Sequence, residues 1–413
     1  MRRTGIALAA GLALVAVVAV VALLDRGRPQ DARVAVSLTP SPTSTPTASA
    51  SPAAVLDDRF GFVSVSFAPS PSPVWQVVVR RESDVQPSHD LTDGLGNQRR
   101  MVMSNYQMPV SYGLAVSPDG RRLAYWTAIV DPNGGPSPLE LHLLDLAPGA
   151  RPRTLVTLTP EFGEVVGESV VWSNDGTGLV IGMGSSPLRC GADAPSCPPK
   201  YSALYLLETA GGKPREIASM RGNSIVPVAW DRQSRLVAAF ELEPGEGRVL
   251  AYDLIDESGG LVRAQMIIGT SGTVTVAASY DAKQVLVHEY SSPGQVLHVW
   301  PLASPERAVV LSPRGEQILA PARWRPGTAE IGVLFDDRLE LWDATGARRR
   351  VPLPALQPSA GGFRPFFFRL DGNAAFVGRY GPTPSYVAVE LASGRTAVIP
   401  GEYWLSASVL VSP

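Results

Sequence analysis

Histidine most often binds metals or transfers protons near neutral pH, and this chain of 413 residues has four of them. They are His89, His142, His288 and His298. His288 and His298 fall on the two strands of one expected hairpin, which would bring them near each other. Two histidines without a third ligand do not complete a metal site. We interpret these two as polar or core strand residues, and we expect neither a metal nor a cofactor.

Four aspartates recur at one position of a repeated pattern: Asp119, Asp175, Asp281 and Asp371. A ring of carboxylates could donate and accept protons. However, aspartate at this position accepts hydrogen bonds from the turn backbone, which explains the spacing without catalysis. The chain also lacks the G-x-S-x-G, G-x-x-x-x-G-K and H-E-x-x-H motifs. We therefore predict that it is not an enzyme.

The two cysteines, Cys190 and Cys197, lie in the proline-containing stretch CGADAPSC. In an exported protein such a pair predicts a small disulfide loop. Two thiols without further cysteines or a nearby histidine do not complete a zinc site, and the spacing differs from that of the redox motif C-x-x-C. We predict a disulfide between Cys190 and Cys197.

A repeated strand-turn-strand pattern must position these residues. Its copies begin at Val116, Trp172, Trp230, Ala278, Trp324 and Phe368. Each copy has an apolar or aromatic residue, a turn and an alternating apolar strand. The turn dipeptides are Asp119-Gly120, Asp175-Gly176, Gln233-Ser234, Asp281-Ala282, Gly327-Thr328 and Asp371-Gly372. We expect the aromatic residues that begin four of the copies to pack between neighbouring sheets.

A second hairpin follows the first in most copies, so one repeat holds four strands. Four strands every 40 to 50 residues is the period of β-propeller blades. Val411-Ser412-Pro413 repeats Val116-Ser117-Pro118, and residues 57–67 resemble the remainder of that repeat. We therefore expect the C-terminal strand to close the N-terminal blade. The predicted fold is an all-β propeller of seven four-stranded blades over residues 55–413; the alternative is a β-sandwich with similar hairpins.

The pattern SPDGRRLAY, its variant WSNDG and the hairpins after them resemble the TolB-like family of bacterial propeller repeats. LELWD at residues 339–343 resembles the related WD repeat. The resemblance covers roughly residues 55–413 and implies a propeller fold. It implies no single function, because such propellers serve as partner-binding platforms, as non-catalytic domains of peptidases and as enzymes.

Residues 6–24 form an uncharged apolar run close to the ~20 residues that span a bilayer as a helix. No clear small-x-small cleavage site lies between this run and Asp25, which favours a retained transmembrane anchor in residues 1–25 over a signal peptide. Residues 26–54 are rich in Pro, Ser and Thr and predict a disordered linker. We expect a single-pass protein of a bacterial cell membrane with an extracytoplasmic propeller; the alternative is secretion after signal cleavage.

Charge is nearly balanced, with 36 Lys and Arg residues against 38 Asp and Glu residues. Basic residues are scattered except for ARRRV at residues 347–351, and we interpret that run as a solvated turn. A nucleic-acid-binding protein needs a clustered basic face. We therefore expect no nucleic acid partner, and we expect a monomeric propeller.

Loops on a rigid scaffold usually carry function, and the longest insertions are expected on the face opposite the Asp-Gly turns. The candidate binding residues on that face are Asp131, Asn133, Glu161, Phe162, Glu164, Arg189, Lys200, Glu243, Phe363 and Arg364. The predicted function is a non-catalytic binding platform for a protein or cell-envelope partner. One alternative is an envelope enzyme that acts on a polymer through carboxylates in the central funnel. Another is a small-ligand sensor, which would need a closed apolar pocket.

Overall fold

The computed structural model describes much of the chain between residues 55 and 410. The described ranges are 55–68, 74–82, 89–90, 99–101, 114–129, 139–147, 150–158, 164–186, 201–242, 249–266, 273–291, 294–313, 315–354, 365–379, 385–400 and 404–410. Residues 50–413 form one compact unit. Within the described ranges, no helix is long and apolar enough to cross a membrane. The predicted anchor (residues 1–25) and linker (residues 26–54) lie outside them.

The described strands form seven sheets, named A to G below. Sheet A contains β29 (Trp404–Leu410), β1 (Phe60–Ala68), β2 (Val74–Arg81) and β3 (His89–Asp90). Sheet B contains β4 (Arg99–Met101), β5 (Leu114–Val116), β6 (Arg122–Ile129), β7 (Leu139–Asp145) and β8 (Arg153–Leu158). Sheet C contains β9 (Glu164–Trp172), β10 (Gly178–Ser186), β11 (Tyr201–Glu208) and β12 (Arg215–Arg221). Sheet D contains β13 (Ser224–Asp231), β14 (Leu236–Leu242), β15 (Val249–Asp256) and β16 (Leu261–Met266).

Sheet E contains β17 (Thr273–Ala278), β18 (Gln284–Ser291), β19 (Gly294–Pro301) and β20 (Val309–Leu311), and the short 3-10 helix η3 (Pro305–Arg307) lies before β20. Sheet F contains β21 (Arg323–Trp324), β22 (Ile331–Leu334), β23 (Arg338–Trp342) and β24 (Arg348–Pro352). Sheet G contains β25 (Phe366–Phe368), β26 (Ala374–Arg379), β27 (Ser385–Glu390) and β28 (Thr396–Pro400).

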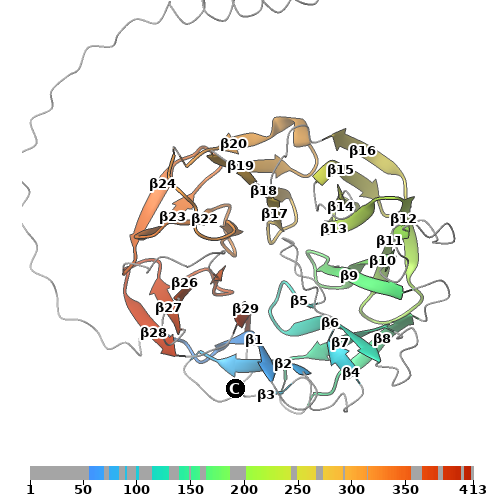
Figure 1. Ribbon diagram of the computed structural model, residues 1–413, viewed down its shortest axis with the longest axis horizontal. Helices are drawn as coiled ribbons and strands as arrows, with labels where there is room; N and C mark the ends of the chain where they lie inside the picture. The colour runs from blue at the N-terminus through green and yellow to red at the C-terminus, as the bar shows by residue number, and fades with distance from the viewer. Residues whose placement is uncertain are drawn as a thin grey trace, which may run out of the picture. The chain divides into compact units, whose positions relative to one another are not determined.

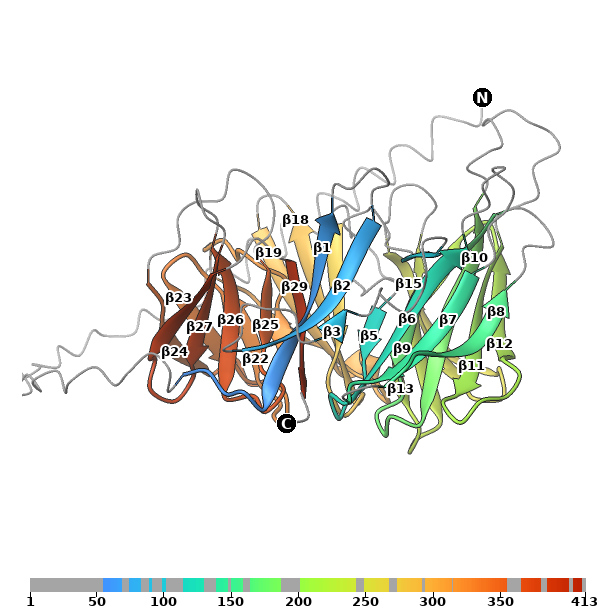
Figure 2. The ribbon, with the colours of Figure 1, turned by 90° about the horizontal axis from the view of Figure 1, so that it is seen from below.

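The sheets follow one another in chain order around a ring (Figure 1), and Figure 2 shows the strands running between the two faces of that ring. β29 pairs antiparallel with β1, with Phe60 opposite Leu410, so the first and last described strands share sheet A. Sheet B departs from the four-stranded pattern because β4 and β5 both pair with β6. The prediction of an all-β propeller fold is confirmed.

A serine and an aspartate organise the turn that follows the first strand in three of the sheets. In sheet C, the Asp175 carboxylate accepts hydrogen bonds from Ser173 Oγ (2.6 Å) and from the Thr177 N–H (2.9 Å). Ser173 Oγ in turn accepts the Gly178 N–H at 2.9 Å. The same bonds recur in sheet B at Ser117 and Asp119, and in sheet E at Ser279 and Asp281. These side chains satisfy backbone donors that have no strand partner.

Glycine is needed in these turns because one residue adopts left-handed backbone angles. Gly120, Gly176 and Gly372 have φ values of 70°, 71° and 70°, which glycine adopts without steric cost. Ala282 holds that position in sheet E with a φ of 55°. In sheet D the left-handed residue is Arg235, with a φ of 58°, and not part of the predicted Gln233-Ser234 turn. The turn is displaced because Asp231 accepts the Gln233 N–H at 3.1 Å, which starts the turn at Asp231.

The recurring aromatic residues pack each sheet against the preceding one. Trp172 packs into a buried cluster with Trp126 and Leu141 of sheet B, and its indole N–H donates to the Ala115 carbonyl at 2.9 Å. Trp324 repeats this arrangement between sheets E and F, because its N–H donates to the Ala277 carbonyl of sheet E at 3.1 Å. Trp230 and Phe368 lie in clusters with sheets C and F, respectively. The repeat position therefore joins neighbouring sheets.

Candidate functional site

Most of the predicted binding residues and both cysteines lie outside the described residues. Glu164 is the exception: it is the first residue of β9, and only its backbone is described. The predicted residues outside the described ranges are Asp131, Asn133, Glu161, Phe162, Arg189, Lys200, Glu243, Phe363, Arg364, Cys190 and Cys197. The loop-face binding site and the disulfide therefore stay predictions.

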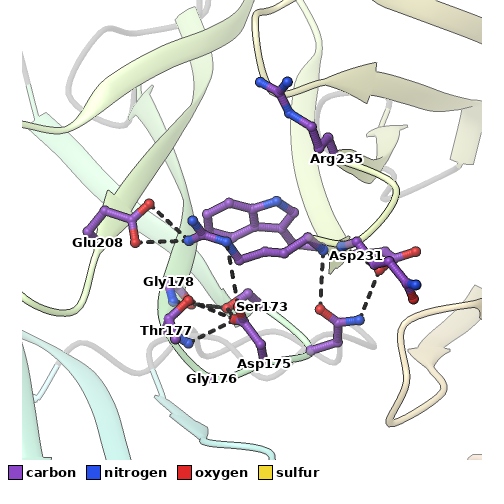
Figure 3. Close-up of polar contacts among 12 residues, drawn as sticks. Ser173, Asp175, Gly176, Thr177, Gly178, Glu208, Asp231 and Arg235 are labelled. Atoms are coloured by element: carbon purple, nitrogen blue, oxygen red, sulfur yellow. Dashed lines mark hydrogen bonds and ion pairs between the residues drawn. The ribbon is translucent and has the colours of Figure 1, made fainter.

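The recurring aspartates belong to the turns. Burial acts to raise the pKa of Asp119, Asp175 and Asp371, but hydrogen bonds to their carboxylates outweigh it and lower each pKa below its ordinary value. The donors to Asp175 are Ser173 and Thr177, as Figure 3 shows. A carboxylate held ionised by its own turn is a poor general acid. Ser117, Ser173 and Ser279 complete this arrangement at Asp119, Asp175 and Asp281, and their recurrence two residues before those aspartates was the signal in the sequence.

The histidines do not converge on a shared site. In the β18–β19 pair, His288 lies opposite Leu297 and Val287 lies opposite His298, so His288 and His298 point to opposite faces of sheet E. His288 is fully buried, and desolvation lowers its pKa to about 3. His142 is buried in sheet B, where its ring nitrogens lie 2.8 Å from Thr127 Oγ1 and 3.2 Å from Thr154 Oγ1. Only the backbone of His89, in β3, is described.

A pocket of about 300 Å³ lies where one strand from each of six sheets ends. Its walls come from β5, β9, β13, β17, β21 and β25 together with the turns that follow them. Figure 1 shows β5, β9 and β17 on the inner side of the ring. The pocket therefore lies on the axis of the ring and opens on the face with the Asp-Gly turns. That face is opposite to the one that the sequence favoured.

Alanine, valine and aromatic side chains form most of the pocket wall, and Tyr280 and Arg323 lie among them. Trp172, Trp324 and Phe368 each line it. Tyr280, in the turn after β17, is 43% exposed because it faces the pocket. Desolvation raises the pKa of Tyr280 to about 12, while the charge of Arg323 acts in the opposite direction. Both residues line the same pocket.

The Asn174 side chain joins three sheets at the wall of this pocket. Its amide N–H groups donate to the Asp231 carboxylate at 2.9 Å and to the Asp281 carbonyl at 3.2 Å, and its oxygen accepts the Arg232 N–H at 3.1 Å. Beside it, the Arg232 guanidinium lies over the Trp230 ring and donates to both oxygens of Glu208 at 2.9 Å. Figure 3 shows these polar contacts around Asp175, Glu208 and Asp231. The turns at this end of the ring are therefore held in place before any ligand binds.

The described residues that line the axial pocket include no histidine, aspartate or glutamate. Elsewhere in the described part of the chain, no group of three or more His, Cys, Asp or Glu side chains is arranged to hold a metal ion. What the pocket offers is aromatic and aliphatic surface, the Tyr280 hydroxyl and the Arg323 guanidinium. Such a surface binds a compact apolar body that carries an anionic or hydrogen-bond-accepting group.

Neither a protein-family model nor a curated protein sequence matches this chain. Its fold is similar to that of oligogalacturonate lyase from Vibrio parahaemolyticus, with a TM-score of 0.52 and 14% identity over 78% of this chain and 84% of that one. Puromycin hydrolase gives a TM-score of 0.53 and 16% identity over 82% of this chain and 52% of its own. TolB from Acinetobacter baumannii gives a TM-score of 0.41 at 10% identity over 85% of this chain and 65% of its own, which is too low to support an argument.

These similarities correct one prediction. The absence of familiar catalytic motifs led to the prediction that the chain is not an enzyme. That prediction is wrong, because oligogalacturonate lyase and puromycin hydrolase are enzymes with similar folds. At 14% and 16% identity the similarity extends to the fold alone. A propeller of this kind is compatible with catalysis and with binding.

Proposed function

We propose that this protein binds a small ligand with an anionic group in the axial pocket. The observation that carries the proposal is the pocket itself, which is lined by six sheets and places Tyr280 and Arg323 among aromatic and aliphatic walls. A largely apolar concave site with a few convergent polar groups is the usual form of a small-molecule site. Binding is the step that this geometry supports, and it is compatible with later conversion of the ligand.

The polar groups would have separate roles. The Arg323 guanidinium would bind a carboxylate or similar anion, because its planar N–H donors match the two oxygens of such a group. The neutral Tyr280 hydroxyl would donate a second hydrogen bond, since its raised pKa keeps the proton in place throughout the physiological range. The tryptophan faces would cover the apolar part of the ligand.

The other predicted functions have less support. An enzyme that uses carboxylates in the central funnel would need acidic side chains there, and the described lining of the axial pocket supplies none. Binding of a protein or cell-envelope partner on the loop face depends on loops outside the described residues. We propose the extracytoplasmic, membrane-tethered location on the basis of the apolar residues 6–24 and the Pro, Ser and Thr-rich linker after them.

Benzoate is a suitable first probe because it joins a carboxylate to an aromatic ring of pocket size. We expect saturable binding by ligand-observed NMR. Arg323→Gln should weaken this binding by about tenfold or more, and Tyr280→Phe by a smaller factor, because a charged hydrogen bond contributes more than a neutral one. Benzamide, which has the same shape without the charge, should bind more weakly than benzoate.

Tyr201→Phe is the matched control, because Tyr201 is a partly exposed tyrosine in β11 that bonds to Glu216 and lies outside the axial pocket. It should leave benzoate binding unchanged. Equal binding of benzoate to the parent and to both pocket variants would contradict the proposal. So would a loss of binding in Tyr201→Phe as large as that in Tyr280→Phe.

A further inference from the structure

A second concave site of about 500 Å³ lies between sheets C and D, which are neighbours in the ring (Figure 1). Its walls come from β12 of sheet C and from β13, β15 and the turn after β15 in sheet D. Gly259 in that turn lies so near sheet C that a Cβ added to it would come within 2.9 Å of the Ile217 carbonyl oxygen. The two sheets are therefore in close contact at one end of this groove, named the C–D groove below.

Asp253 of β15 is the unusual residue of the C–D groove. It is 7% exposed and lies opposite Ala239 and Ala264 in its sheet. Strand alternation places it on the same face as Ile255, which packs with Ile217 of sheet C. Among the described residues, no side chain or backbone group donates a hydrogen bond to the Asp253 carboxylate or pairs with its charge. A buried carboxylate without a partner is costly to maintain.

A neighbouring negative charge increases this cost. Glu241 lies on the same face of the adjacent strand β14, and its carboxylate accepts the Asn223 amide. Glu216 of β12 does not add to it, because its carboxylate accepts hydrogen bonds from Tyr201 (3.1 Å) and Tyr205 (3.0 Å) on the face of sheet C that packs against sheet B. Desolvation, and then the charge of Glu241, raise the pKa of Asp253 to about 6. No residue in the described lining of the groove carries a positive charge.

The remaining wall of the C–D groove is largely aliphatic. Ile217, Met220 and Ile255 line it, as does Leu261, which is 60% exposed. Ser219 and Ser258 add hydroxyl groups. An aliphatic wall with a buried carboxylate fits a molecule that has an alkyl chain and a cationic end, since the chain would cover the apolar residues and the cation would neutralise the acid.

We propose that the C–D groove binds an alkylammonium group, with the Asp253 carboxylate accepting hydrogen bonds from its N–H groups and with Met220 and Leu261 packing against its alkyl chain. The same chemistry is found in a free aliphatic amine and in a lysine side chain of a polypeptide. This site is separate from the axial pocket, and its test is independent of that of the proposed function.

Isothermal titration calorimetry on the full-length protein at pH 7.5 provides the test, with 1,5-diaminopentane and N-acetyl-lysine methylamide as probes. We expect saturable binding of at least one probe. Asp253→Asn should weaken it by about tenfold or more, because a charge-assisted hydrogen bond is lost. Affinity should also fall as the pH is lowered through 6, where Asp253 gains a proton. Binding of the diamine alone indicates a free amine as the natural ligand, binding of the lysine derivative alone indicates a polypeptide, and binding of both shows that the groove accepts an alkylammonium group from either source.

Two controls keep the result decisive. Asp336→Asn removes an exposed carboxylate between β22 and β23, far from the groove lining, and should leave binding unchanged. 1-Pentanol has a similar chain without the charge and should not bind the parent protein, which tests the need for a cation even if Asp253→Asn fails to fold. The proposal is overturned if neither amine binds, if 1-pentanol binds as well as the diamine, or if calcium chloride displaces the amine from Asp253.

Discussion

Glu82 is a buried carboxylate where sheet A meets sheet G. It is 2% exposed, and one oxygen accepts the Asp57 N–H at 2.9 Å and lies 3.5 Å from the Arg369 guanidinium. The other oxygen has no hydrogen-bond partner among the described residues. Desolvation outweighs these favourable contacts and raises the pKa of Glu82 to about 7. Near neutral pH, a single proton at this site therefore affects stability.

The free energy of unfolding should fall as the pH rises from about 4.5 to 7. The folded state holds the Glu82 proton more tightly than the unfolded chain, so this stabilisation is fully present below pH 4.5 and is lost as the pH passes through 7. A rise from 4.5 to about 7 corresponds to roughly 3 kcal/mol. Glu82→Gln should remove this component, as urea unfolding at several pH values would show. Parallel pH profiles for parent and variant would contradict the prediction.

The turns are the elements in which local chemistry and backbone geometry can be compared from sheet to sheet. Glycine occupies the left-handed position in several of them, but Arg235 holds it in sheet D. The Arg235 side chain is 71% exposed and pairs with Glu257 at 3.1 Å. Exposed ion pairs contribute little to stability, whereas a side chain in left-handed geometry costs about 1 kcal/mol. The turn of sheet D is therefore strained relative to the turns of sheets B, C and G, which have glycine at this position.

Arg235→Gly should be more stable than Arg235→Ala by about 1 kcal/mol. Both substitutions remove the ion pair with Glu257, so they differ in the presence of a Cβ atom at a φ of 58°. The difference in the free energy of unfolding between the two variants is this strain less the extra backbone entropy that glycine loses on folding. Equal stability, or a more stable alanine variant, would show that the turn relaxes around the side chain.

At the scale of the whole molecule, pairing between β29 and β1 joins the last described strand to the first. Contacts of this kind close a propeller and remove an exposed sheet edge. Arg369 of sheet G reinforces the junction, because it contacts Glu82, the Val55 carbonyl and the Phe60 ring. The pocket on the axis depends on this closure, since its walls come from six sheets that the ring holds in place.

Deletion of residues 404–413 should lower the unfolding temperature by about 10 °C or more, because an entire strand and its ladder to β1 are lost. A synthetic peptide with the sequence of residues 404–413, added to the shortened protein, should restore part of that loss. Differential scanning calorimetry measures both effects. An unchanged unfolding temperature after deletion would show that the ring does not depend on this strand.

The candidate sites could be predicted from the sequence only in part. The role of Ser173 and Asp175 could be predicted, because their hydrogen bonds lie within one turn and recur at fixed spacing. The faces of His288 and His298 depend on the strand register, which brings Val287 rather than His288 opposite His298. Tyr280 and Arg323 lie in adjacent sheets more than forty residues apart, and no local pattern brings them together. The sequence pattern therefore does not predict the axial pocket, and it favoured the loop face instead.

The all-β class, the repeated turn and the aromatic contacts between sheets could be predicted from the sequence. These features follow from period-two alternation and turn chemistry, which act over a few residues. Strands from six sheets enclose a pocket, and Asp253 and Glu82 are buried with incomplete partners, only because of how the chain packs in three dimensions. Burial and desolvation depend on which distant segments pack together, and the spacing of residues along the chain does not record that packing.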